Sequence, residues 1–200
     1  MHEEEKDQGL SRRGVIGAAS LIPLAALGAP ATKQTFQDRH LRIIEAFVDR
    51  MIPSDEHGPG ARESGVATYI DRSFGDALAA ERPSFLAGLE AIDALARSKH
   101  GAPFAALDPV EMDEILTALE NNESTGFSPD SRTFFYRVRQ LTLEGMFGDP
   151  FYGGNRAFAG WDLIRYPGPR MAVSAEDQRL REPIKPLRTS AANRAGRHGH

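Results

Sequence analysis

Apolar residues recur at helical spacing in several separate stretches of this chain, and this pattern constrains the fold more than any other feature. Between Phe36 and Ile52 most apolar residues fall on one face of a helix, and Pro53 ends the run. No stretch shows sustained alternation of β-branched residues, so we expect minimal sheet content. The chain is therefore predicted to be all-α, with a compact domain of about five to six helices over residues 32–170.

One predicted helix, from Pro109 to about Glu120, has an unusually complete start signal. Asp108 is placed as its N-cap, Pro109 occupies the first helical position, and Glu111 completes a capping box. Further helices are expected to begin near Ser64, to run from about Ser84 to Lys99, to run from Ser128-Pro129 to near Gly145, and, as a short helix, to span about Ala157 to Ile164.

The segment from Glu144 to Arg170 combines aromatic residues and glycines without a helical period. It holds six of the sixteen aromatic residues and six of the 19 glycines in the chain. Such a segment either closes one end of the helical domain or contacts another protein, since Trp, Tyr and Arg dominate interface energetics and glycine permits close backbone approach. Both roles stay open on sequence grounds. The candidate partner-binding residues are Phe147, Asp149, Pro150, Phe151, Tyr152, Asn155, Arg156, Trp161 and Tyr166.

The first 31 residues indicate an export signal. Arg12 and Arg13 precede a short apolar run that ends in Ala29-Pro30-Ala31, a small-x-small pattern suited to cleavage. The run is shorter than the roughly 20 apolar residues that a membrane span requires. We therefore predict a twin-arginine signal peptide over residues 1–31 and a periplasmic location, with an uncleaved anchor helix as the alternative.

Composition limits the chemistry open to the chain. A net charge of −4 does not favour binding of nucleic acid. The absence of cysteine excludes disulfides, thiolate-held iron–sulfur clusters and a cysteine nucleophile within the chain. The twin-arginine route carries proteins that fold before export, often around a cofactor, yet no cofactor motif is found here. We therefore expect no cofactor in this chain, and either a cofactor-bearing partner that shares its export signal or a chain that simply folds quickly.

One polar turn gathers possible metal ligands, namely Asp55, Glu56, His57 and Glu63. The cluster has a single histidine and lacks the spacing of an EF-hand, so a structural turn is the simpler interpretation. In such a turn Ser54 and Asp55 accept hydrogen bonds from nearby backbone N–H groups. We accordingly expect no metal site.

Other polar residues also have simple structural interpretations. His40 lies within an amphipathic helix, where a packing role is expected. Glu111 and Glu114 lie near a helix start and favour the helix dipole. The run Gly153-Gly154-Asn155-Arg156 suits a tight turn better than an anion cradle, although both readings are possible. We expect no catalytic residue in this chain.

Two stretches carry a resemblance to a known family. IPSDEHGPGARESGVATYIDRSF (Ile52 to Phe74) and EGMFGDPFYGGNRAFAGWDLIRYPG (Glu144 to Gly168) resemble the two signature blocks of the gluconate 2-dehydrogenase subunit 3 family. The resemblance runs from about Phe36 to Arg170. Two positions depart from the family pattern: Leu141 stands where a histidine is expected, and Arg165 where glycine often precedes Tyr-Pro-Gly.

The resemblance implies a non-catalytic small, or gamma, subunit of a periplasmic flavin-dependent dehydrogenase for gluconate or another sugar or sugar acid. Its expected partner is a large FAD-dependent flavoprotein of the glucose–methanol–choline type. A third subunit, a cytochrome c with haem c, often accompanies such a pair. The small subunit would hold no cofactor, stabilise the flavoprotein and escort it through twin-arginine export. Association with the inner membrane would come only through the complex.

Two rival functions remain open on sequence grounds. The chain could be an independent periplasmic hydrolase or metal-binding protein that uses Asp55, Glu56 and His57. It could also be a free-standing periplasmic structural protein whose aromatic segment only completes its own core. The basic C-terminal arm, residues 171–200, has few large apolar residues and no period, so we expect it to be extended or disordered.

Overall fold

Helices make up the regular secondary structure in the part of the chain that the computed structural model describes, which is residues 34–170, 172, 174–175, 178–179 and 184–190. The α-helices are α1 Asp38–Met51, α2 Val66–Gly75, α3 Arg82–His100, α4 Pro109–Glu120, α5 Ser131–Phe147 and α6 Ala159–Leu163. Short 3₁₀ turns are η1 Ala79–Glu81, η2 Phe104–Ala106, η3 Pro150–Tyr152 and η4 Arg156–Phe158. No strand occurs among these residues, so the all-α prediction is confirmed.

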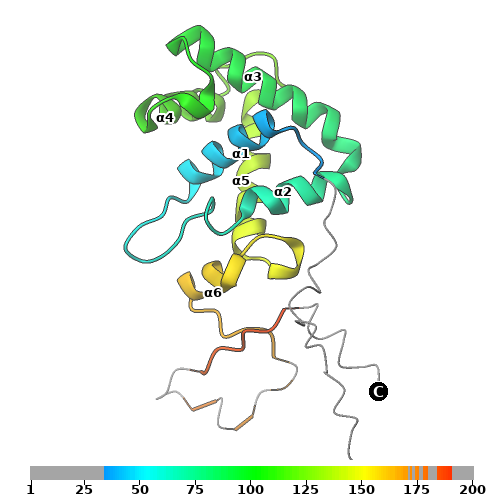
Figure 1. Cartoon of the computed structure of the whole chain (residues 1–200), viewed down its shortest axis with the longest axis vertical. Coiled ribbons are helices and arrows are strands. Elements are labelled where there is room, and N and C mark those ends of the chain that lie inside the picture. Colours follow the sequence, from blue (N-terminus) through cyan, green and yellow to red (C-terminus); the bar gives the residue numbers. More distant parts are fainter. Residues whose placement is uncertain (1–33, 171, 173, 176–177, 180–183, 191–200) are drawn as a thin grey trace, which may run out of the picture. The chain divides into compact units, whose positions relative to one another are not determined.

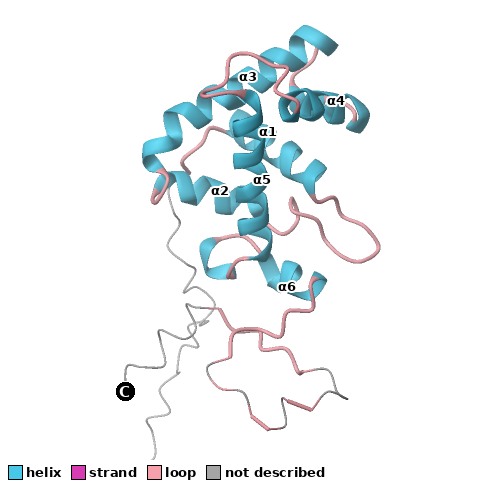
Figure 2. Ribbon diagram, turned by 180° about the vertical axis from the view of Figure 1, so that it is seen from behind, coloured by secondary structure: helices cyan, strands magenta, loops and turns pink. Residues whose placement is uncertain are grey.

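Helix α5 organises the arrangement, because it contacts all five other α-helices. Figures 1 and 2 show α5 running past α1 and α2 from the α3–α4 end to α6, which lies at its C-terminal end. Its buried side chains include Phe134, Phe135, Val138 and Leu141. These residues recur at helical spacing, so the face that the sequence pattern predicted is the one that enters the core.

The helix boundaries follow the end signals in the sequence, with two informative differences, both in α5. Helix α4 spans the predicted residues, and the Asp108–Glu111 capping box is formed. Helix α5 begins later than expected, because Asp130 rather than Ser128 caps it through a 2.8 Å bond from Thr133 N. It also continues past Gly145, since that glycine is a packing position and not a helix end.

A cluster of aromatic rings fills the space where α2, α3 and α5 meet. The rings of Phe74 and Phe85 stack with centroids 4.2 Å apart, and the ring of Phe134 lies 5.3 Å from that of Phe85. Gly88 on α3 leaves room for Phe134, because a Cβ at this position would overlap the ring. The close approach of α3 to α5 therefore depends on a residue without a side chain.

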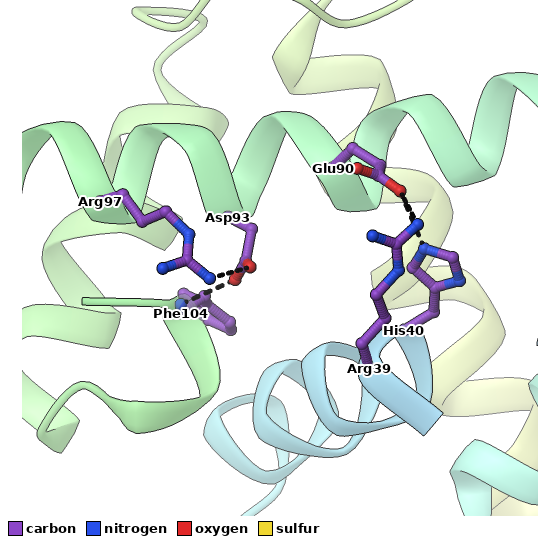
Figure 3. Close-up of polar contacts among 6 residues, drawn as sticks. All are labelled: Arg39, His40, Glu90, Asp93, Arg97 and Phe104. Atoms are coloured by element: carbon purple, nitrogen blue, oxygen red, sulfur yellow. Dashed lines mark hydrogen bonds and ion pairs between the residues drawn. The ribbon is translucent and has the colours of Figure 1, made fainter. Parts of the chain in front are cut away.

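Polar contacts tie α3 to α1 and to the turn before α4 (Figure 3). His40, which is buried, places Nε2 3.0 Å from Glu90 Oε1, and Arg39 donates to the same oxygen. The contact with His40, supported by Arg39, lowers the pKa of Glu90 below its ordinary value. Asp93 accepts from the backbone N–H of Phe104 at 2.9 Å. These contacts give His40 the packing role expected from the sequence.

The predicted signal peptide, with Arg12 and Arg13, lies outside the described residues and stays a prediction. None of the described helices combines the length and apolar character needed to cross a bilayer. Residues 184–190 of the C-terminal arm have no regular secondary structure and contact the end of the helical domain. Leu187 N donates to Pro167 O at 2.9 Å, and Arg188 forms an ion pair with Asp162.

Candidate partner interface at the end of helix α5

The two sequence blocks that carry the family resemblance lie together in space. Tyr69 Oη on α2 donates to Glu144 Oε2 on α5 at 2.9 Å. Arg156 N, in the aromatic segment, donates to the carbonyl oxygen of Ser64 at 2.9 Å. The backbone of α5 at Gly145 packs closely on Tyr69 and Val66. Blocks far apart in the sequence therefore build one structural unit around the C-terminal end of α5.

Two glycines let the aromatic segment fold back tightly against α5. A Cβ on Gly154 would collide with the carbonyl oxygen of Gly145, and one on Gly160 would collide with that of Met146. Both residues are buried. Because backbone atoms are the neighbours in each case, a side chain could fit only if the helix end moved. The glycines thus explain how a non-periodic segment can seal the end of the helix.

Asn155 stabilises the turn by which the aromatic segment folds back against α5. Its side chain is completely buried, its Nδ2 donates to Gly148 O at 2.7 Å, and its Oδ1 accepts from Gly160 N at 2.8 Å. Its backbone is left-handed, with φ of 44°, a conformation that asparagine tolerates better than most residues. Asn155 therefore bridges the start and the end of the turn.

Trp161 is likewise part of the internal packing. Only 4% of it is exposed, and its Nε1 donates to Phe147 O at 2.9 Å. Phe147 itself is half-buried and packs against the hydrophobic core. Asn155 and Trp161 therefore expose almost no surface in this chain, and their role as partner-binding residues stays a prediction. Their side chains are packed inside the chain, and their polar groups find hydrogen-bond partners there.

Phe151 and Tyr152 are different, because the chain presents them to solvent. They are 53% and 56% exposed, and their rings pack edge to face with centroids 5.2 Å apart. The turn that carries them is well defined: Asp149 accepts from Phe151 N at 2.9 Å, and Pro150 occupies the first position of η3. Asp149 and Pro150, which were predicted as partner-binding residues, thus hold the turn that carries the two aromatic side chains.

The remaining exposed apolar residues of the segment follow Trp161. Tyr166 is exposed, although its ring meets that of Trp161 at 5.0 Å. Leu163 and Ile164 are also exposed, and we did not single them out from the sequence. No sequence signal marks them as exposed, because Ile164 lies three residues after Trp161, a spacing that puts two residues on the same face of a helix. Arg156 is exposed as well.

Comparison with known proteins decides the family. A family model described as gluconate 2-dehydrogenase subunit 3 matches residues 38–168. The chain belongs to this family. Its members are accessory subunits of a dehydrogenase complex, and the match covers both blocks that meet at the end of α5. No curated protein and no solved structure matches the chain.

The polar turn after α1 is the site that an independent hydrolase or metal-binding protein would use. Its own hydrogen bonds hold it in place. Asp55 Oδ1 accepts from His57 N at 2.8 Å, and Ser54 Oγ accepts from Gly60 N at 2.8 Å, as turn chemistry predicts. Among the described residues no group of three or more possible ligands is placed to hold a metal ion. Glu63 lines an open depression of about 570 Å³ that adjoins the start of this turn, together with Glu45, Asp49, Pro53, Ser54 and Arg62.

The carboxylates near the start of α4 have structural partners in this subunit. Glu111 Oε2 accepts from Asp108 N at 3.1 Å, which completes the capping box. Glu111 and Glu114 also lie 3.6 and 3.5 Å from the two ring nitrogens of His100 on α3. These contacts join α3 to α4 and give the pair of glutamates a role in packing.

Proposed function

We propose that this subunit binds the FAD-dependent flavoprotein of its complex through the exposed aromatic residues beside the Gly153 turn. The observation that carries the proposal is the exposure of Phe151 and Tyr152 on a turn held in place by Asp149 and Pro150. Burying one such side chain contributes about 1.5–3 kcal/mol, so two neighbouring rings can anchor a stable complex. Their low side-chain flexibility reduces the entropy lost on binding.

The proposed role is structural and not catalytic. The flavoprotein would supply FAD and oxidise gluconate or a related sugar or sugar acid, and a cytochrome c would supply haem c for onward electron transfer. This chain would hold no cofactor of its own. It would stabilise the flavoprotein and, through Arg12 and Arg13, escort it to the periplasm by the twin-arginine route. The family membership and the paired arginines support this role.

A binding measurement with a matched control tests the interface. We expect Phe151→Ala combined with Tyr152→Ala to weaken the affinity for the purified flavoprotein by about tenfold or more. Tyr136→Ala removes a similarly exposed aromatic side chain from α5, at a position outside the segment, and serves as the control. The free energy of unfolding of each variant should be measured alongside its affinity. An unchanged affinity of the Phe151/Tyr152 variant would refute the proposed interface.

The export role has its own test. Changing Arg12 and Arg13 to lysine should retain both this subunit and the flavoprotein in the cytoplasm, since the paired arginines are the signal that the route reads. Dehydrogenase activity in the periplasmic fraction measures the outcome. Wild-type periplasmic activity in this variant would contradict the escort role and leave the interface untouched.

A further inference from the structure

Arg72 on α2 has a polar atom that the chain itself leaves unsatisfied. Its Nε is sealed from solvent and has no hydrogen-bond partner. Its guanidinium lies against the Gly153 turn, with Nη1 3.0 Å from the point that a Cβ on Gly153 would occupy. A desolvated donor on a charged group is costly unless an acceptor reaches it. Arg72 as a whole is half-buried, and its guanidinium has no hydrogen-bond or ion-pair partner among the described residues. An acceptor from outside the chain could therefore pair with the part of Arg72 that reaches the surface.

Arg156 brings a second positive charge to the same turn. Its Nη2 and the carbonyl oxygen of Gly153 each lie 3.2 Å from the point that a Cβ on Gly65 would occupy. Two guanidinium groups therefore border Gly153, one from α2 and one from the aromatic segment. Neither has an ion-pair partner among the described residues. Some other arginines do have one, namely Arg39 with Glu90, Arg50 with Asp113, Arg62 with Glu45, Arg97 with Asp93 and Arg137 with Glu81. Arg42, Arg82 and Arg139 also have none among the described residues, so Arg72 and Arg156 are distinguished by lying at the same turn.

The arrangement suits one kind of ligand. Two guanidinium groups at one turn repel each other unless an anion lies near them, and a carboxylate can accept hydrogen bonds from both. The exposed rings of Phe151 and Tyr152 immediately precede Gly153, so the charged spot adjoins an apolar surface. An anion presented by a protein surface would use both features, whereas a small free anion would use only the charges.

We propose that Arg72 and Arg156 together bind a carboxylate side chain of the flavoprotein, next to the aromatic contact made by Phe151 and Tyr152. This inference rests on the proposed function, and it adds the chemistry of the group that the partner must present. The carboxylate would give the two guanidinium groups a shared acceptor and offset the repulsion between them. It would also fix the orientation of the partner, because paired guanidinium groups accept a carboxylate in few geometries.

The test compares arginine variants of the full chain in binding to the purified flavoprotein. We expect Arg72→Gln and Arg156→Gln each to weaken the affinity by about tenfold, and the double variant by up to about a hundredfold. The wild-type affinity should fall more steeply with salt than that of the double variant. Arg139→Gln changes an exposed arginine on α5 and should leave the affinity unchanged. Arg156 is exposed, so its variant remains informative even if Arg72→Gln fails to fold.

The outcomes separate this inference from the proposed function. Loss of binding in the Phe151/Tyr152 variant with wild-type affinity in both arginine variants would overturn the carboxylate site alone. A wild-type chain that does not bind the flavoprotein would overturn both. Inorganic phosphate added to the free chain provides a further arm. If phosphate raises the unfolding temperature through Arg72 while the arginine variants keep their affinity for the flavoprotein, the site takes a free anion and the proposal fails.

Discussion

Trp161 and Phe151 belong to the same glycine-rich segment, yet their side chains have opposite environments. Trp161 is 4% exposed and has its indole N–H bonded to Phe147 O, whereas Phe151 is 53% exposed and packs on Tyr152. Both would look equally suited to an interface by residue type. Only the buried one has its apolar surface and its polar group satisfied inside the chain.

The difference shows that the segment has two parts with different roles. The inner part, which includes Asn155, Gly160 and Trp161, seals the end of α5. The outer part, Phe151 and Tyr152, stands on the frame that the inner part provides. A substitution should therefore affect stability when it falls in the inner part and partner binding when it falls in the outer part.

The largest expected effect is on stability, in Trp161→Ala. Removing a buried tryptophan should lower the free energy of unfolding by about 3–5 kcal/mol, because the change loses burial and leaves a cavity. Phe151→Ala should stay within about 0.5 kcal/mol of wild type, since its ring is exposed. Urea unfolding followed by far-UV circular dichroism measures both. Equal losses in the two variants would remove the distinction between inner and outer parts.

Asn155→Ala should have the next largest effect, about 2–3 kcal/mol, because two buried hydrogen bonds lose their side-chain partner. Asn122→Ala is the matched control, since Asn122 also has a positive φ, of 63°, but is exposed. The control should lose only about 1 kcal/mol from the left-handed backbone, because its one side-chain bond comes from Ser131 Oγ, which also reaches Leu119 O at 3.2 Å. The same urea titration gives the comparison. A loss no greater than that of Asn122→Ala would mean that the bonds of Asn155 do not stabilise the segment.

Helices whose ends are marked by local chemistry could be predicted well from the sequence. Helix α4 matches its prediction because Asp108, Pro109 and Glu111 act within a few residues of one another. The start of α5 was misplaced because Ser128 and Asp130 are both reasonable caps, and only the bond from Thr133 distinguishes them. Gly145 suggested a helix end, yet it serves the contact with α2, which no local pattern reveals.

The candidate site could be located from the sequence but not resolved into parts. The aromatic segment has no period, so nothing in the sequence tells that Trp161 points inward and Phe151 outward. The position of Arg72 depends on how α2 meets a turn far along the chain. Such contacts follow from the packing of whole helices. Sequence reasoning therefore found the segment and missed the arginine that adjoins it.

Tyr69→Phe tests whether the bond from α2 to Glu144 supports the inner part. The variant should lose about 0.5–1.5 kcal/mol at neutral pH. Burial, assisted by the bond to Glu144, raises the pKa of Tyr69 above its ordinary value of 10.0 in the folded chain. The stabilisation is then fully present below pH 10 and is lost as the pH rises through the folded-state pKa.

Two measurements check this prediction. Unfolding free energies between neutral and alkaline pH should decline above pH 10 more in wild type than in Tyr69→Phe. Absorbance of tyrosinate should lose its latest-titrating component in the same variant. Tyr152→Phe removes an exposed hydroxyl from the outer part and serves as the control. A decline of equal size in wild type and Tyr69→Phe would show that Tyr69 is not the group responsible.

The smallest effect concerns the ion pair between Arg188 and Asp162, which joins the C-terminal arm to α6. Both side chains are partly exposed, so Asp162→Asn should change the free energy of unfolding by no more than about 0.5 kcal/mol. The arm would nonetheless loosen locally, because Arg188 would keep only its contact with the ring of Phe158, at 5.8 Å. Amide exchange at Leu187, which donates to Pro167 O, should therefore speed up severalfold, while exchange in the core of α5 stays unchanged. Unchanged exchange at Leu187 would mean that the arm is held by its backbone contacts and packing, and that the inner part is complete without this ion pair.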